Sequence, residues 1–215
     1  MSNTQKFINA CEKGNTEAII NLIALGVYPS LRDNLGIKTA AFNGNYDTFV
    51  YLSTLPEVDV LCEDLYCFKA ACEKGYIDIV KYIYDNYDFD IRIDNSYVIK
   101  NTTSPDVLNF LISTDKFDLS TVGSHLLENA TTPEIMSIVL SIPDIIIPEN
   151  IIINVCKSLY MRSLCDTLDL FLRDNRVDIQ NILDNTNGAF GNFKNYLENV
   201  ILQIRQENID EIMRV

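Results

Sequence analysis

The sequence contains no tryptophan and a single histidine, His125, among its 215 residues. Long apolar runs are also absent, and the most apolar stretch, residues 137–155, is interrupted by two prolines and two acidic residues. A helix that spans a membrane needs about 20 consecutive apolar residues, so no membrane span is expected. The first residues lack a basic head followed by an apolar core, which is the pattern of a secretory signal. We therefore expect a soluble, cytoplasmic protein with no membrane partner.

Positive charge is scarce, because 17 lysines and arginines face 30 acidic residues and leave a formal net charge of −13. A surface of that sign repels nucleic-acid phosphates, so direct binding of DNA or RNA is not expected. Three interpretations of the acidity remain open. The acidity maintains solubility only, attracts a basic protein partner, or imitates DNA.

Catalytic and metal-binding motifs are missing as well. The chain has no glycine-rich phosphate loop and no Gly-x-Ser-x-Gly nucleophile turn. Cys62, Cys67 and Cys72 are spaced by five, whereas zinc sites usually use close pairs of ligands, and His125 has no second histidine to join it. The six cysteines are interpreted as small apolar residues in a reducing compartment. We predict no enzymatic activity, no cofactor and no metal site.

An internal repeat organises the first half of the chain. The segment Ala10-Cys11-Glu12-Lys13-Gly14 recurs as Ala71-Cys72-Glu73-Lys74-Gly75, and Ala40-Ala41-Phe42-Asn43-Gly44 lies halfway between. An acidic residue follows each glycine by three places, and apolar residues at helical spacing come next. This pattern predicts a helix that ends at a left-handed glycine, then an antiparallel helix whose first turn carries the acid. Such units cannot bury their apolar faces alone, so they must stack.

The repeat continues in a degraded form. Three later segments match the second helix of a unit, at residues 104–112, 132–140 and 166–172, and the first two begin with proline before an acid. The pattern stops near Gln180, and a helix over residues 193–206 is predicted to cap the last unit. The expected organisation is residues 1–180 as repeats, clear over 1–94 and degenerate over 95–180, followed by a capping region over 181–215.

These residues resemble the ankyrin repeat, with the Ala-Ala-x-x-Gly core, the acid and the apolar second helix in register. In the first unit the matching positions are Phe7, Ala10, Cys11, Gly14, Glu17, Ile19, Leu22, Ile23, Gly26 and Asp33. The Thr-Pro-Leu-His start of the family pattern is absent from every unit. Residues 90–100 resemble a divergent type of ankyrin repeat found in large DNA viruses of amoebae. The resemblance implies an all-α ankyrin solenoid of about six helix-turn-helix units with a C-terminal helical cap.

The resemblance also implies a function in binding proteins, through the connecting segments and the faces of the first helices. Mapped onto this chain, the predicted protein-binding residues are Arg32, Asn34, Thr39, Phe42, Asn43, Glu63, Glu73, Lys74, Arg92 and Asn95. Phe42 is the most informative, because the equivalent positions hold Glu12 and Glu73, and an aromatic residue there is suited to anchor a partner. The alternative is that its ring packs on a neighbouring unit. The main hypothesis is a non-enzymatic interaction module, virus-encoded and engaging a host protein in the host cytoplasm; the second is an acidic DNA mimic.

Overall fold

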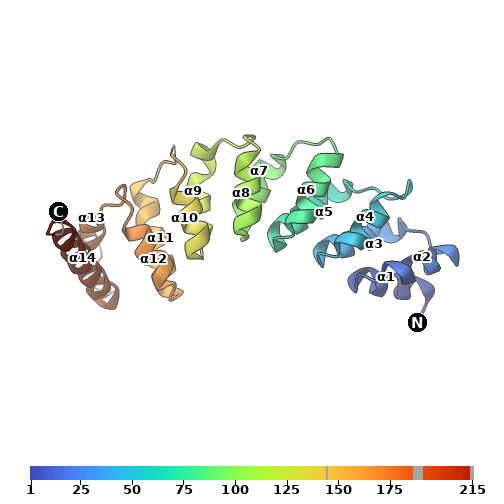
Figure 1. Ribbon diagram of the computed structural model, residues 1–215, viewed down its shortest axis with the longest axis horizontal. Coiled ribbons are helices and arrows are strands. Elements are labelled where there is room, and N and C mark those ends of the chain that lie inside the picture. Colours follow the sequence, from blue (N-terminus) through green and yellow to red (C-terminus); the bar gives the residue numbers. More distant parts are fainter. Residues whose placement is uncertain (144, 186–190, 214–215) are drawn as a thin grey trace. The chain divides into compact units, whose positions relative to one another are not determined.

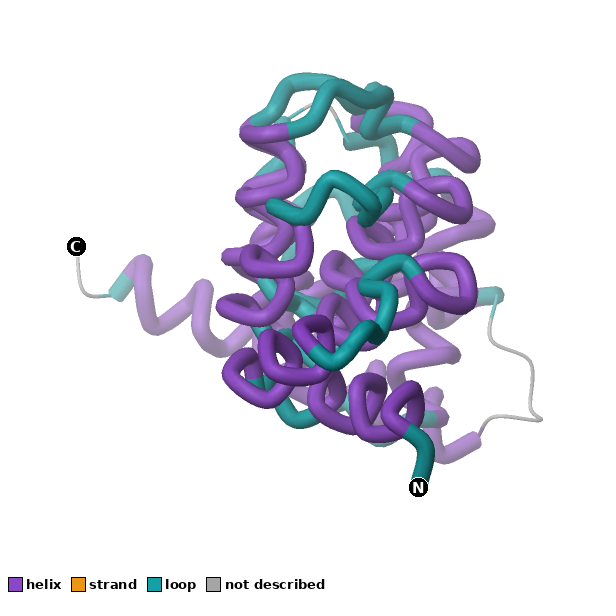
Figure 2. The backbone as a smooth tube through the Cα atoms, turned by 90° about the vertical axis from the view of Figure 1, so that its right-hand side faces the viewer, coloured by secondary structure: helices purple, strands orange, loops and turns teal. Residues whose placement is uncertain are grey.

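The structure is a computed structural model that describes residues 1–143, 145–185 and 191–213. Within those ranges all regular structure is helical, as Figure 2 shows by colour. The helices are α1 (Asn3–Glu12), α2 (Thr16–Ala24), α3 (Leu31–Phe42), α4 (Tyr46–Ser53), α5 (Cys62–Lys74), α6 (Ile77–Asn86), α7 (Ile93–Asn101), α8 (Pro105–Ser113), α9 (Leu119–Asn129), α10 (Pro133–Leu140), α11 (Glu149–Met161), α12 (Cys165–Leu172), α13 (Ile179–Asp184) and α14 (Gly191–Ile212). None of these helices, as far as they are described, is long and apolar enough to cross a membrane.

The chain divides into two compact units, Met1–Phe117 and Asp118–Val215. In the first unit, helices α1, α3, α5 and α7 pack successively against one another, and α2, α4, α6 and α8 form a second layer (Figure 1). In the second unit, α9 packs on α11, α10 packs on α12, and α13 packs on α14. Six helix pairs and a terminal pair thus confirm the predicted all-α repeat architecture. The predicted boundary at residue 180 stays a prediction.

Glycine turns the chain between the two helices of each of the first three pairs. Gly14, Gly44 and Gly75 have φ angles of 69°, 72° and 80°, in the left-handed region that favours glycine. The residue after each glycine donates its N–H to the carbonyl of the small residue that begins the repeated motif, for example Asn45 to Ala40 at 3.0 Å. This bond is typical of a Schellman cap and confirms the turn predicted from the repeat.

The later pairs start their second helix without that glycine. Ser104 accepts the N–H of Val107 in α8, and Thr132 accepts the N–H of Ile135 in α10. A proline follows each cap at the first helical position, where its missing N–H is not needed. The sequence pattern therefore located both helices although the glycine is lost.

A left-handed turn precedes the first helix of the second, third and fourth pairs. Residues 32–34, 63–65 and 94–96 all have φ between 48° and 65°, although none of them is glycine. Each turn closes with an N–H four residues after its acceptor, such as Ser96 to the carbonyl of Arg92 at 2.9 Å. Asparagine and aspartate tolerate this region better than other residues. These turns fall within the first residues of α3, α5 and α7, directly before the positions that lack the Thr-Pro-Leu-His start, and the right-handed part of each helix begins after them.

Each unit buries its own aromatic and aliphatic core. Phe7, Phe49 and Phe68 are fully or almost fully buried in the first unit, as are Phe171 and Phe193 in the second. The predicted capping helix exists as α14, and Phe193, Leu197 and Val200 form its buried face. Residues 186–190 and 214–215 of the predicted capping region lie outside the described residues.

The cysteines behave mainly as apolar core residues. Cys11, Cys62, Cys67, Cys72 and Cys156 are buried free thiols, whereas Cys165 is exposed. Burial raises the pKa of the Cys11 and Cys156 thiols to about 12, which keeps them protonated at neutral pH.

Candidate protein-binding groove

A groove lies between the first helices of the second and third pairs, α3 and α5. It has a volume of about 300 Å³ and is lined by Leu35, Lys38, Thr39, Phe42, Asn43, Glu63 and Tyr66. The four residues Thr39, Phe42, Asn43 and Glu63 were singled out from the sequence as protein-binding, and the fold brings them together here. We call this site the α3–α5 groove.

The Phe42 ring is at the rim of the α3–α5 groove and is 44% exposed. The Lys74 ammonium of the next pair lies over its face, with Nζ 4.7 Å from the ring centroid. This contact is a cation–π interaction between two of the predicted binding residues. Phe42 therefore meets a neighbouring repeat and still presents nearly half of its surface to solvent.

Lys38 forms the polar centre of the α3–α5 groove. Its side chain is 9% exposed, and its Nζ lies 2.5 Å from Glu63 Oε1 and 3.9 Å from Asp33 Oδ2. Burial disfavours the ammonium, but the hydrogen bond and charge of Glu63, aided by Asp33, outweigh it and raise the pKa of Lys38. The same hydrogen bond lowers the pKa of Glu63. Both groups therefore stay charged at neutral pH.

The lysine–carboxylate contact recurs one repeat later. Lys69 pairs with Asp94, and both residues stand 31 positions after Lys38 and Glu63. The Tyr97 hydroxyl donates to Glu73, so this predicted binding residue is engaged within the fold and only partly exposed. Each of these pairs joins a first helix to the left-handed turn or first helix of the next repeat.

The remaining predicted residues lie outside the α3–α5 groove. Arg92 is exposed and pairs with Asp90, with Nε–Oδ1 and Nη2–Oδ2 distances of 2.9 and 3.0 Å. Arg32 and Asn95 are exposed in left-handed turns. Asn34 is only 7% exposed, and its side-chain oxygen accepts the N–H of Asp59 at 3.0 Å. Its side chain therefore supports a loop and offers little surface to a partner.

Sequence reasoning missed three lining residues of the α3–α5 groove, Leu35, Lys38 and Tyr66. A signal for Lys38 was present, because lysine recurs at positions 38, 69 and 100, always two residues before the small pair or its equivalent. A repeated charge on an otherwise apolar helix face indicates a repeated partner. Leu35 and Tyr66 carry no comparable signal.

Few side chains in the described part of the chain are arranged as catalytic or metal-binding groups. His125 is exposed on α9. Across residues 1–143, 145–185 and 191–213, no group of three histidine, cysteine, aspartate or glutamate side chains is arranged to hold a metal ion. The α3–α5 groove contains an ion pair, a hydroxyl, an amide and two aromatic rings, which are groups suited to recognition.

Comparison with known proteins gives one local match. The chain is 32% identical over 77 residues to a protein of Acanthamoeba polyphaga mimivirus that is named as an ankyrin repeat protein, L66. The match covers 36% of this chain and 13% of that protein, so the chain spans only a small part of its relative. No family model and no solved structure matches the chain. The chain is therefore an all-helical repeat protein that is similar, over about a third of its length, to a mimivirus protein named as an ankyrin repeat protein.

Proposed function

We propose that the chain is a non-enzymatic protein-binding module and that the α3–α5 groove is its principal binding site. The observation that carries the proposal is the exposed Phe42 ring beside Thr39, Asn43 and Glu63 on two packed helices. Aromatic side chains that are held at a surface by a rigid scaffold are common anchors of protein interfaces. The helices are already packed, so little ordering would be needed on binding.

The similarity to a viral ankyrin repeat protein supports a finer proposal about the setting. We infer that the chain is virus-encoded and that its partner is a protein of the host cell, met in the host cytoplasm. The partner search should therefore begin with a host proteome.

The alternative, an acidic DNA mimic, needs a stripe of carboxylates without counter-charges. Asp85, Asp88, Asp90 and Asp94 form a local cluster in the sequence that could contribute to such a stripe. Arg92 pairs with Asp90, and Lys69 pairs with Asp94, so two of the four carboxylates are already neutralised. This pairing favours the groove over mimicry.

Site-specific crosslinking tests the proposal. A photo-reactive amino acid is placed at Asn43, in the α3–α5 groove, and in a separate protein at Asp47, which is exposed on α4 of the same pair. We expect one host protein to crosslink through position 43 and not through position 47. Phe42→Ala should abolish that crosslink while the helical circular dichroism stays unchanged.

Equal crosslinking at both positions would contradict the proposal, as would full crosslinking of the Phe42→Ala variant. Capture that instead follows the charge of Asp85 and Asp88, and is competed by duplex DNA, would favour the mimic.

A further inference from the structure

The hydrogen-bonding groups of the α3–α5 groove are biased toward acceptors. The Thr39 hydroxyl donates its hydrogen to the Leu35 carbonyl, with an O–O distance of 2.7 Å. The Asn43 amide donates to the Thr39 carbonyl at 2.8 Å. A hydroxyl that donates in this way can still accept, and the amide oxygen of Asn43 is an acceptor. Both side chains can therefore accept hydrogen bonds from an occupant that brings donors.

The carboxylate of the same groove keeps one oxygen for a partner. The single ammonium of Lys38 is shared by Glu63 and Asp33, at 2.5 and 3.9 Å. The Glu63 side chain is 48% exposed, and Lys38 contacts its Oε1. Its second oxygen can thus accept from a partner. The net charge of −13 adds a long-range attraction for positive groups.

Two aromatic rings complete the lining. Phe42 is 44% exposed and Tyr66 is partly exposed. The Lys74 ammonium lies 4.7 Å from the Phe42 centroid, so this ring attracts a cation, and an arriving guanidinium would take the place of that ammonium. A planar guanidinium suits this ring better than a compact ammonium. It can stack on the ring face and at the same time donate hydrogen bonds in its own plane.

We propose that the α3–α5 groove receives an arginine side chain of the partner protein. The guanidinium stacks on the exposed aromatic surface of Phe42 or Tyr66, and its N–H groups donate to Glu63 and to the side-chain oxygen of Asn43. Arginine fits better than lysine because its five donors lie in one plane, which suits acceptors that flank an aromatic wall. This inference rests on the proposed function, and it names the chemistry of the partner.

The test uses Nα-acetyl-argininamide as the probe and Nα-acetyl-citrullinamide as its neutral isostere, followed by NMR of the full chain. We expect argininamide to shift the ring resonances of Phe42 and Tyr66 in a saturable way, while citrullinamide leaves them unchanged. Glu63→Gln should weaken argininamide binding by about tenfold, since a charge-assisted hydrogen bond contributes about 1.5 kcal/mol or more. Glu57→Gln, an exposed carboxylate in the preceding loop, is the matched control and should bind normally.

Should Glu63→Gln disturb the turn at residues 63–65, Phe42→Ala offers a second route, and it should remove the saturable shift at Tyr66. Equal shifts with citrullinamide, equal weakening in Glu57→Gln, or no saturable shift up to the solubility limit of argininamide would each overturn the inference.

The arginine inference and the proposed function fail in different ways. A host protein that crosslinks through Asn43 while argininamide does not bind refutes the arginine and leaves the module in place. Argininamide that binds in the groove while no protein crosslinks there refutes the module. Both the module and the arginine are supported if the crosslinked segment of the partner carries an arginine. Capture of that partner should then be lost on Arg→Lys substitution in the segment.

Discussion

The two units of the chain stack helix pairs in the same order but hold them with different chemistry. In Met1–Phe117, left-handed glycines turn the chain within the first three pairs, and lysine–carboxylate pairs join neighbouring repeats. In Asp118–Val215, Ser163 takes the left-handed position between α11 and α12, with φ of 59°. Arginine replaces lysine as the connecting cation in that unit.

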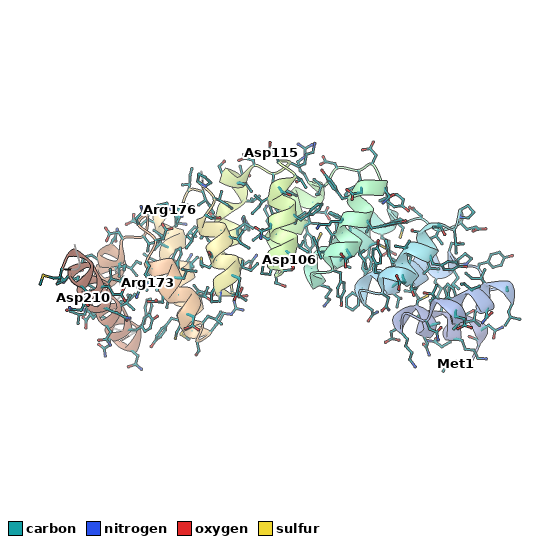
Figure 3. All side chains as sticks on the ribbon, in the orientation of Figure 1. Met1, Asp106, Asp115, Arg173, Arg176 and Asp210 are labelled. Atoms are coloured by element: carbon teal, nitrogen blue, oxygen red, sulfur yellow. The ribbon has the colours of Figure 1, made fainter. Side chains whose placement is uncertain are left out.

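Arg176 and Arg173 illustrate the second arrangement (Figure 3). Arg176 donates to the Leu140 carbonyl at 2.7 Å and pairs with Asp174, so it ties the loop after α12 to the end of α10. Arg173 bridges Asp169 on α12 and Glu207 on α14. The comparison teaches that the helix-pair architecture does not depend on one set of contacts. The glycine motif is already lost in the fourth pair, where Ser104 caps α8, so the second unit lacks the residues by which the repeat is recognised in the sequence.

The largest effect is expected at a glycine of the first unit. An added Cβ at Gly44 would lie 2.5–2.7 Å from the Tyr76 ring, in addition to the strain of φ at 72°. Gly44→Ala should lower the free energy of unfolding by about 3 kcal/mol, measured by chemical denaturation. Gly26→Ala is the matched control, because its φ is 89° and nothing lies within 4 Å; it should cost about 1 kcal/mol. Equal losses would show that the Tyr76 contact contributes nothing.

A smaller effect is expected at the arginine of the second unit. Arg176→Ala removes donors to the Leu140 and Ile142 carbonyls and leaves Asp174 with only the backbone N–H of residue 176. The free energy of unfolding should fall by about 2 kcal/mol, and faster hydrogen exchange should be confined to α10–α12. Arg176→Lys should recover less than half, because lysine lacks the planar fork. Arg92→Ala, an exposed pair within one loop, should have no measurable effect. If Arg92→Ala lowered the free energy of unfolding as much as Arg176→Ala, the proposed difference between the two units would be wrong.

The ion pair between Arg176 and Asp174 should also make the stability of the second unit depend on pH. The hydrogen bond from Arg176, opposed in part by burial, lowers the pKa of Asp174. A lowered pKa means that the stabilisation is complete above the usual carboxyl range and is lost as the pH falls through that range and below it. Asp174→Asn should therefore lower stability by roughly 1 kcal/mol at pH 7 and by much less near pH 3. Asp85→Asn, at an exposed position of the first unit, is the control. If the loss of stability in Asp174→Asn did not change with pH, the ion pair would not have this role.

The smallest effect tests the left-handed position of the second unit. Ser163→Gly removes side-chain strain at φ of 59° but gives the unfolded chain more freedom, so a gain of about 0.5 kcal/mol is expected. Ser158→Gly, at an exposed site within α11, should instead lose about 0.5–1 kcal/mol. If Ser163→Gly is also destabilising, its hydroxyl has a role that the left-handed backbone does not explain.

The sequence by itself determined the helix pairs. A glycine three residues after a small pair favours the end of a helix, and Ser or Thr before Pro and an acid favours the start of one. These rules predict α2, α4, α6, α8 and α10, and the apolar pattern of residues 166–172 predicts α12. They also brought Thr39 and Phe42 to one helix face, because residues three apart lie side by side on a helix.

Tertiary structure decided the rest. Lys38 meets Glu63 across 25 residues, and Arg176 meets Leu140 across 36, so no local pattern contains either contact. The left-handed turns at residues 32–34, 63–65 and 94–96 contain no glycine that would predict them from the sequence. Their conformation depends on the helices that they connect. The α3–α5 groove needs Tyr66 from one repeat beside Phe42 from another. Stacking creates that proximity, because a repeat can bury its apolar face only against its neighbour.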